Sequence, residues 1–229
     1  MYYTGRSGSD RRCSDHQRIK SHRRRSGSIY RNAIQKTDHS EQEKAEDKDS
    51  CSVGSVNANT TAQMEELWLS QRTHNEFVHT RELLEGEKRR EQEIRRVVNS
   101  ILGECDRNNI STVTGDGIYP ENRIDFTPYM ERYQCSLDEV TGMINSAFAE
   151  ITYRIFKTED TFKGLYTSGG DVTVAVCKRF DTAGLSLLDE VLPLAAYGQF
   201  LKGESKVYIS LQKAEAREIK MRSISALLI

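Results

Sequence analysis

The sequence has no long hydrophobic run, and this absence excludes one class of protein. None of its apolar stretches approaches the ~18 consecutive residues of a transmembrane helix. No apolar stretch follows the early Arg6, Arg11 and Arg12 either, so a secretory signal peptide is not expected. The five cysteines and five histidines are scattered and form no C-x-x-C pair, which argues against a protein-held metal site and a disulfide framework. We therefore expect a reduced, cytoplasmic protein with no membrane partner.

Two familiar nucleotide-binding fingerprints are also missing. Neither G-x-x-x-x-G-K-[ST] nor G-x-G-x-x-G occurs in the chain. The hydrophobic content of 37% is low beside 29% charged residues, which indicates that part of the 229-residue chain lies outside any core. A chain of this length has room for one ordinary domain with an appendage.

The first 49 residues form a compositional zone of their own. Residues 1–37 carry ten Arg and Lys against two Asp, and residues 38–50 are polar and mildly acidic. No period of 2 or 3.6 is present that would bury one face, so we predict that residues 1–49 are disordered or poorly packed. An alternative function is a non-catalytic α/β domain with a basic nucleic-acid-binding arm. The arm lacks the interleaved aromatic residues of a base-stacking surface, so a nucleic-acid partner is not the favoured interpretation.

Strands and helices alternate from Cys51 onward. Periodicity predicts strands over 51–55, 76–79, 110–114 and 164–167, and helices over 87–107 and from near 60, 136 and 170. The helix over 87–107 has an apolar stripe made of Ile94, Val97, Val98, Ile101 and Leu102. Ser136 and Glu139 stand at the spacing of a capping box, after a loop that contains two glycines and two prolines. The alternation predicts a three-layer α/β fold with a mostly parallel, Rossmann-like sheet flanked by helices.

The stretch T-S-G-G-D-V at residues 167–172 carries the candidate chemistry. A strand runs into Gly169 and Gly170 and continues directly as a helix. Paired glycines expose backbone N–H groups, and the start of the helix directs its free N–H groups and positive dipole end to the same place, which suits a phosphate. Ser168 adds a hydroxyl donor, and Asp171 is a metal ligand, a ribose contact or a partner of the helix dipole. A plain tight turn accounts for the same spacing, so spacing alone leaves both interpretations open.

Two separated motifs resemble one family. Residues 164–203 resemble the C-terminal nucleotide-binding domain of the four-carbon acid sugar kinases, in which a strand, [TS]-G-G-[DE], a helix, E-V-x-P and spaced glycines follow in order. The matching residues after the helix are Glu190, Val191, Pro193, Gly198 and Gly203. The segment V-G-S-V at 53–56, with Thr61 and Gln63 after it, resembles the opening strand-to-helix element of that domain.

The resemblance covers about residues 50–205 and implies a function. It implies that ATP is bound, with Mg²⁺, by Ser55, Ser168, Gly169, Gly170 and Asp171. It further implies transfer of the γ-phosphate to a hydroxyl group of threonate, erythronate or 3-oxo-tetronate, a reaction that depends mostly on positioning and charge stabilisation. It assigns no catalytic residue in this chain, and it leaves a homodimer open.

Both ends of the chain depart from the family pattern. The substrate domain and a C-terminal T-K-G-G element are missing, although the codons permitted for residues 211–223 and 10–24 spell family-like text in another reading frame. We therefore hypothesise a frameshifted, truncated relative. In this hypothesis residues 1–49 are an out-of-frame remnant, 50–205 a nucleotide-binding domain and 206–229 an altered strand and helix tail. Without an acceptor pocket, little or no kinase activity is expected.

Overall fold

The computed structural model describes residues 48–54, 58–70, 72–192, 195–201 and 208–212. The basic segment predicted to be disordered, the candidate Ser55 and most of the predicted tail lie outside these residues. The first strand begins at Lys48, slightly before the domain boundary expected at residue 50. Among the helices that the structure describes, none combines the length and the apolar character needed to cross a membrane.

A seven-stranded sheet forms the middle layer, with the strand order β2-β3-β1-β4-β7-β6-β5. Its strands are β1 Lys48–Val53, β2 Thr73–Val78, β3 Ile110–Gly115, β4 Phe162–Ser168, β5 Gly184–Leu192, β6 Ala195–Leu201 and β7 Tyr208–Gln212. The strands from β2 to β7 in this order are parallel, whereas β6 and β5 add antiparallel pairings at one edge. A Cβ at Gly198 in β6 would lie 2.5 Å from the carbonyl oxygen of Ser186 in β5, so this pairing requires a glycine there.

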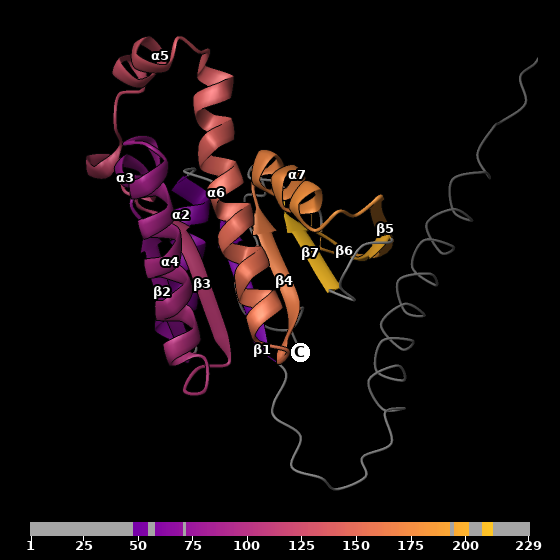
Figure 1. Cartoon of the computed structure of the whole chain (residues 1–229). Coiled ribbons are helices and arrows are strands. Elements are labelled where there is room, and N and C mark those ends of the chain that lie inside the picture. The colour runs from indigo at the N-terminus through magenta and orange to yellow at the C-terminus, as the bar shows by residue number, and fades with distance from the viewer. Residues whose placement is uncertain (1–47, 55–57, 71, 193–194, 202–207, 213–229) are drawn as a thin grey trace, which may run out of the picture. The chain divides into compact units, whose positions relative to one another are not determined.

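Helices cover both faces of the sheet. They are α2 Ala58–Ser70, α3 Thr80–Leu84, α4 Glu87–Glu104, α5 Thr127–Tyr133, α6 Leu137–Thr158 and α7 Gly170–Arg179, and two 3₁₀ turns, η1 Asp116–Ile118 and η2 Pro120–Asn122, follow β3. Helices α4, α6 and α7 lie on one face and α2 lies on the other (Figure 1). The predicted three-layer, mostly parallel α/β fold is thereby confirmed. The carboxyl ends of the parallel strands point toward the end of the domain at which α5 and the start of α6 project (Figure 1).

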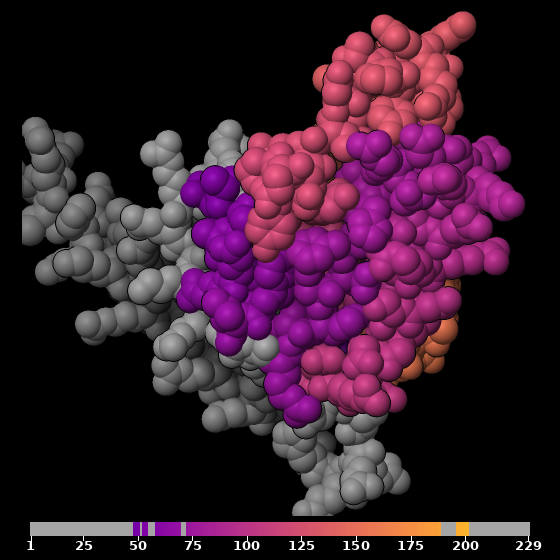
Figure 2. All heavy atoms as spheres, turned by 90° about the vertical axis from the view of Figure 1, so that its left-hand side faces the viewer, coloured from indigo at the N-terminus to yellow at the C-terminus, as the bar shows by residue number. Residues whose placement is uncertain are grey.

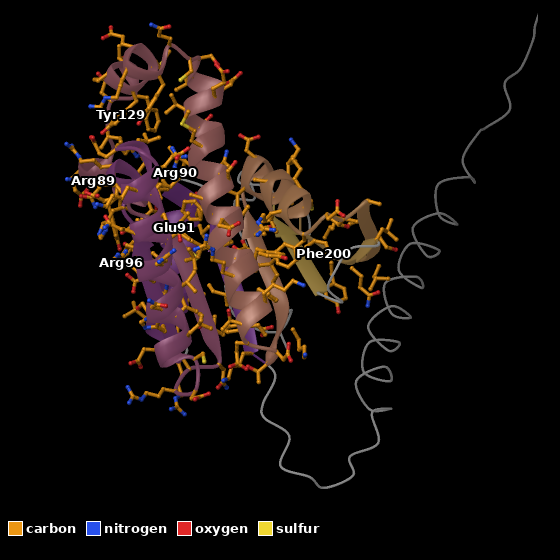
Figure 3. The ribbon with its side chains drawn as sticks, in the orientation of Figure 1. Arg89, Arg90, Glu91, Arg96, Tyr129 and Phe200 are labelled. Carbon is orange, nitrogen blue, oxygen red and sulfur yellow. The ribbon has the colours of Figure 1, made fainter. Side chains whose placement is uncertain are left out.

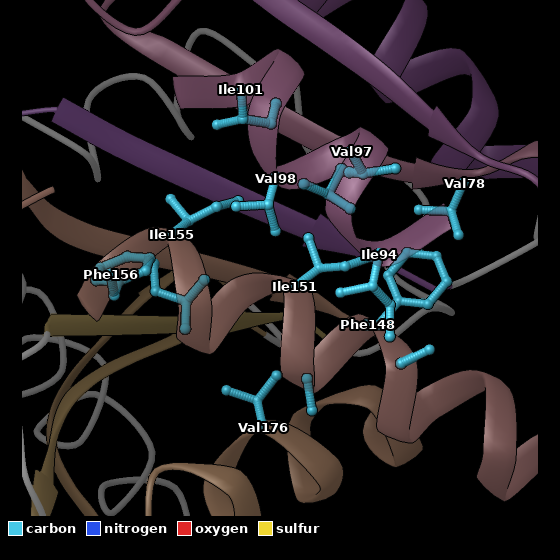
Figure 4. Packing of buried hydrophobic residues seen from close by; sticks show 14 of the residues in the cluster. Val78, Ile94, Val97, Val98, Ile101, Phe148, Ile151, Ile155, Phe156 and Val176 are labelled. Carbon is cyan, nitrogen blue, oxygen red and sulfur yellow. The ribbon is translucent and has the colours of Figure 1, made fainter. Parts of the chain in front are cut away.

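The main core lies between the sheet and helices α4, α6 and α7 (Figure 4). In the predicted stripe of α4, Ile94, Val97, Val98 and Ile101 are buried, and Leu102 is partly buried against the same cluster. Each fully buried aliphatic side chain of this kind contributes about 1.5–3 kcal/mol relative to exposure. This apolar face explains why a helix with so many charged residues docks firmly on the sheet.

A capping box fixes the beginning of α6. The backbone N–H of Glu139 donates to Ser136 Oγ at 3.3 Å, and the backbone N–H of Ser136 donates to Glu139 Oε2 at 2.8 Å. The predicted capping box is confirmed. Because it sets where the first helical turn begins, it also sets which α6 residues face the carboxyl end of the sheet.

The connection between β3 and α6 is more structured than the loop that the sequence predicted. It contains η1, η2 and α5, and it forms a third apolar cluster with Leu84 of α3, Tyr129 of α5 and Val140 of α6. In Figure 2, α5 is seen in pink, projecting beyond the purple and magenta body of α3 and α4. This end of the domain also holds the candidate site.

Candidate functional site

The turn between β4 and α7 holds Ser168, Gly169, Gly170 and Asp171. Gly169 has φ 110°, a backbone conformation that residues with a Cβ rarely adopt. Helix α7 begins at Gly170, and its N-cap residue, Gly169, has no side chain that could provide a capping hydrogen bond. Because the first N–H groups of a helix have no acceptor within it, this turn offers backbone donors and the positive end of the helix dipole to a ligand.

Hydroxyl groups fix the turn from the side of the sheet. The Oγ1 atoms of Thr167 and Thr173 lie 2.8 Å apart, and Thr173 Oγ1 donates to the carbonyl oxygen of Gly169 at 2.9 Å. Ser168 is 1% exposed, and its Oγ has no hydrogen-bond partner within the described part of the chain. An unpaired buried hydroxyl costs about 1–3 kcal/mol, which a ligand reaching it would relieve. Buried serine hydroxyls of β1 and β3 also have no hydrogen-bond partner among the described residues, so an unpaired hydroxyl does not by itself indicate a binding site. Ser168 is a candidate because it lies next to the glycine turn.

The end of β1 lies directly against the same turn. The backbone N–H of Gly54 donates to the carbonyl oxygen of Ser168 at 3.2 Å. A Cβ at Gly54 would lie 2.2 Å from Val172 Cγ2, so β1 and α7 approach this closely only because residue 54 is glycine. Ser55 follows immediately but lies outside the described residues, and its proximity to the turn stays a prediction.

A cleft beside the turn was not found by sequence reasoning. It has a volume of 340 Å³ and lies at the carboxyl ends of β1, β2 and β3, the edge at which parallel α/β sheets bind ligands. Its walls include Gly54, Asp171, Ile124 and Phe126 of the β3–α6 connection, and Ile144 and Phe148 of α6. The long connection after β3 is the feature of the sequence that could have indicated this cleft, because binding residues are often placed on loops at this edge of the sheet.

A second hollow, of 670 Å³, lies between α6 and α7 and shares Asp171 with the cleft. Its arginine, Arg179, is bonded to Glu150 and stacks on the ring of Tyr153 at 3.5 Å from the centroid. Burial acts to raise the pKa of Glu150, but hydrogen bonds from Arg179 and Arg154 outweigh it and hold that pKa below its ordinary value. The carboxylate therefore stays ionised near neutral pH, and the pair serves to join α6 to α7.

The described residues are suited to a metal ion only when a bound ligand supplies further oxygen atoms. Within the described ranges, no three His, Cys, Asp or Glu side chains gather as they do in a protein-held metal site. Asp171 is exposed at the wall of the cleft. Mg²⁺ is commonly bound by one or two carboxylates with phosphate oxygens and waters, so Asp171 fits a magnesium ion that arrives with a nucleotide.

Comparisons with known proteins show which family the chain resembles. A family model described as a nucleotide-binding C-terminal domain matches residues 51–212. A D-erythronate kinase of Heliobacterium modesticaldum is 34% identical over 155 residues, which is 66% of this chain and 34% of that kinase. The chain thus spans about one third of the length of this curated relative.

Solved structures of low sequence identity share the fold. A domain of unknown function from Bordetella bronchiseptica, solved with bound citrate as a domain-swapped dimer, is similar at a TM-score of 0.58 and 14% identity, over 80% of this chain and 40% of that one. A Haemophilus influenzae protein is similar at a TM-score of 0.56 and 13% identity, again over 80% of this chain and 40% of that one. The resemblance seen in the sequence is confirmed, and the chain belongs to the family of nucleotide-binding C-terminal domains found in the four-carbon acid sugar kinases.

Proposed function

We propose that the chain is the ATP-binding part of a kinase that transfers the γ-phosphoryl group of ATP to a hydroxyl group of a four-carbon sugar acid. The observation that carries this proposal is the start of α7 immediately after Gly169, a glycine N-cap at the carboxyl edge of the parallel part of the sheet. Such a glycine turn joined to a helix N-terminus binds phosphate groups through backbone N–H groups and the helix dipole. Family membership and the similarity to a D-erythronate kinase support the classes of nucleotide and acceptor.

Each residue of the turn has a role in this proposal. The N–H groups of Gly170 and Asp171 bind phosphate oxygens, Gly169 allows the close approach, and the hydroxyls of Ser168 and Ser55 add donors. The Asp171 carboxylate contacts either the Mg²⁺ ion on the phosphates or the ribose, and its exposed position in the first helical turn suits both. When bound, Mg²⁺ neutralises the negative charge of the phosphates.

The acceptor pocket belongs to a substrate domain outside this chain. Positioning of an acceptor accounts for ~7–11 kcal/mol of such a barrier, so the chain alone is expected to bind ATP but to turn over little. The same proposal divides the chain into a nucleotide-binding domain over 50–205, an out-of-frame remnant over 1–49 and an altered tail over 206–229. It also includes a cytoplasmic location and a possible homodimer. The alternative nucleic-acid-binding arm lies outside the described residues.

The first test is ATP binding by isothermal titration calorimetry with Gly170→Ala. A Cβ at Gly170 meets no atom within 4 Å, so alanine suits the fold while its methyl group enters the space beside the turn. We expect ATP to bind at least about tenfold more weakly, a loss of about 1.4 kcal/mol. Gly103→Ala in α4 is the matched control, because its Cβ also meets no atom within 4 Å and it lies outside the walls of the cleft. Unchanged affinity in Gly170→Ala, or no ATP binding by the natural chain, would contradict the proposal.

The second test is phosphoryl transfer. The purified chain is assayed with ATP, Mg²⁺ and threonate, erythronate or 3-oxo-tetronate, alone and with a substrate domain supplied in trans. Turnover is expected only with the supplied domain, and robust turnover by the chain alone would show that the acceptor site lies within it. Titration with duplex DNA at about 50 and about 200 mM salt checks the alternative function, and salt-sensitive binding would favour it.

A further inference from the structure

One methionine sulfur lies where helices α3, α4 and α6 meet. Met143, in the second turn of α6, is half-buried. Arg90 Nη2 of α4 donates to Met143 Sδ at 3.6 Å, and Arg90 Nε donates to the carbonyl oxygen of Leu83 in α3 at 2.8 Å. Figure 3 shows Arg90 where α4 faces α6, below Tyr129 of α5. The guanidinium therefore joins the three helices, but one of its bonds ends on a thioether, which is a weak acceptor.

The sulfur can be reached by small molecules from one side. A hollow of 530 Å³ lies between α4 and α6, and Arg90 and Met143 both line it. Gly142 and Ser146 of α6 line it as well, so the side chains next to the sulfur on its own helix are small. A peroxide molecule thus has a path from solvent to Met143. Met64, by contrast, is 1% exposed in the apolar cluster under α2.

Met143 also belongs to the apolar cluster that holds α5 in place. The buried members of this cluster are Leu84 of α3, Tyr129 of α5 and Val140 of α6, and Met143 is one of the partly buried side chains packed against them. Ile144, the next residue of α6, packs against the same cluster and lines the 340 Å³ cleft. A polar group added at Met143 therefore acts on the contacts that hold α5 and one wall of the cleft.

From these observations we propose that Met143 is a site of reversible oxidation by hydrogen peroxide. The thioether sulfur attacks one oxygen of the peroxide, the O–O bond breaks, and the leaving hydroxide takes the remaining peroxide proton to form water. The sulfur is oxidised by two electrons to the sulfoxide, and the peroxide is reduced. The sulfoxide oxygen is a stronger acceptor than the thioether, so the Arg90 guanidinium, which already donates to the sulfur, forms a charge-assisted hydrogen bond with it.

Oxidation changes how residue 143 packs. A methionine sulfoxide is polar and chiral, and burying its oxygen among apolar side chains is costly. The oxidised side chain turns toward Arg90 and the hollow, which leaves Tyr129 and Val140 with fewer apolar contacts and loosens α5. Methionine sulfoxide reductases reverse the reaction. This oxidation requires no particular ligand in the cleft, so it is independent of the proposed kinase function.

The test treats the full natural chain with hydrogen peroxide and follows each methionine by peptide mass spectrometry. Met143 should be oxidised at least about tenfold faster than Met64, because only Met143 is open to the peroxide. Oxidation of Met143 should lower the melting temperature by about 3 °C or more. Hydrogen exchange over α5, residues Thr127–Tyr133, should become faster. Methionine sulfoxide reductase should reverse both effects.

Two leucine variants decide which sulfur is responsible. Met143→Leu keeps an apolar side chain of similar volume, and its melting temperature should not respond to peroxide. Met130→Leu is the matched control, because Met130 packs against the same cluster but does not line the hollow, and it should respond as the natural chain does.

Three results would overturn the proposal. They are oxidation of Met143 no faster than that of Met64, oxidation of Met143 without any change in melting temperature or α5 exchange, and loss of the response in Met130→Leu alone. Should Met143→Leu fold poorly, the oxidation rates in the natural chain and its recovery with the reductase decide the question.

Discussion

Substitution of Gly54 by alanine tests the contact between β1 and α7 that shapes the site. The added Cβ would lie 2.2 Å from Val172 Cγ2, well inside van der Waals contact. Val172 is 2% exposed, so its side chain has little room to turn away. The first turn of α7 must therefore shift away from the end of β1, and the backbone donors at Gly170 move with it.

The expected cost follows from the crowding. Overpacking a close-packed site by one methyl group destabilises a protein by about 1–3 kcal/mol. Val172→Ala alone should also destabilise, by about 1.5–3 kcal/mol, through lost burial and the space that remains. In the double variant the alanine Cβ at residue 54 occupies the space left by the valine methyl groups. The double variant should therefore be more stable than the sum of the single effects predicts, by at least about 1 kcal/mol.

Urea unfolding of the four proteins measures this coupling, and ATP titration of the same samples reports on the turn. We expect Gly54→Ala to lose ATP affinity together with stability, and the double variant to recover part of both. If Gly54→Ala is as stable as the natural chain, or if the single effects simply add, the close approach of β1 and α7 is not what fixes the site.

Three further predictions concern stability. Gly103→Ala should stabilise the chain by about 0.5–1 kcal/mol, because alanine is a better helix former and its Cβ meets no atom within 4 Å. Ser136→Ala should destabilise it by about 1 kcal/mol through loss of the α6 capping box. Hydrogen bonds from Arg154, then from Arg95, hold the pKa of Glu91 at about 2 instead of 4.5, so this carboxylate contributes stability above about pH 4.5 that is lost as the pH falls toward 2. Glu91→Gln should lower the free energy of unfolding by about 1 kcal/mol at pH 7. This loss is smaller than the full pKa shift implies, because Glu91 is 35% exposed. Near pH 2 the variant should be as stable as the natural chain.

Urea unfolding and thermal melts check all three. Destabilisation by Gly103→Ala would mean that α4 is packed more tightly around Gly103 than the structure has it. For Ser136→Ala, an unchanged melting temperature would show that the capping box contributes nothing. Glu66→Gln, on α2, is the control for Glu91→Gln, and an equal pH dependence of the two variants would refute the role of the ion pair.

The sequence by itself determined the local structure and the glycine turn between β4 and α7. In α4 the buried residues recur with the period of a helix, and Ser136 and Glu139 specify the start of α6. Both elements therefore follow from interactions between residues that are close in the chain. The turn at Gly169 and Gly170 was also readable, because the strand, the glycines and the helix are contiguous. The antiparallel addition of β5 and β6 was not predicted, because pairing partners cannot be inferred from the period of a single strand.

Only the tertiary structure decided the cleft and the contact between β1 and α7. The cleft combines Gly54, the β3–α6 connection, one face of α6 and Asp171, which lie far apart in the sequence. Taken locally, each of these parts is ordinary: the end of a strand, an apolar residue in a loop, or one face of a helix. Their proximity depends on the parallel strand order and on how α6 packs across the sheet, and both arise from burial of the whole core rather than from any local pattern.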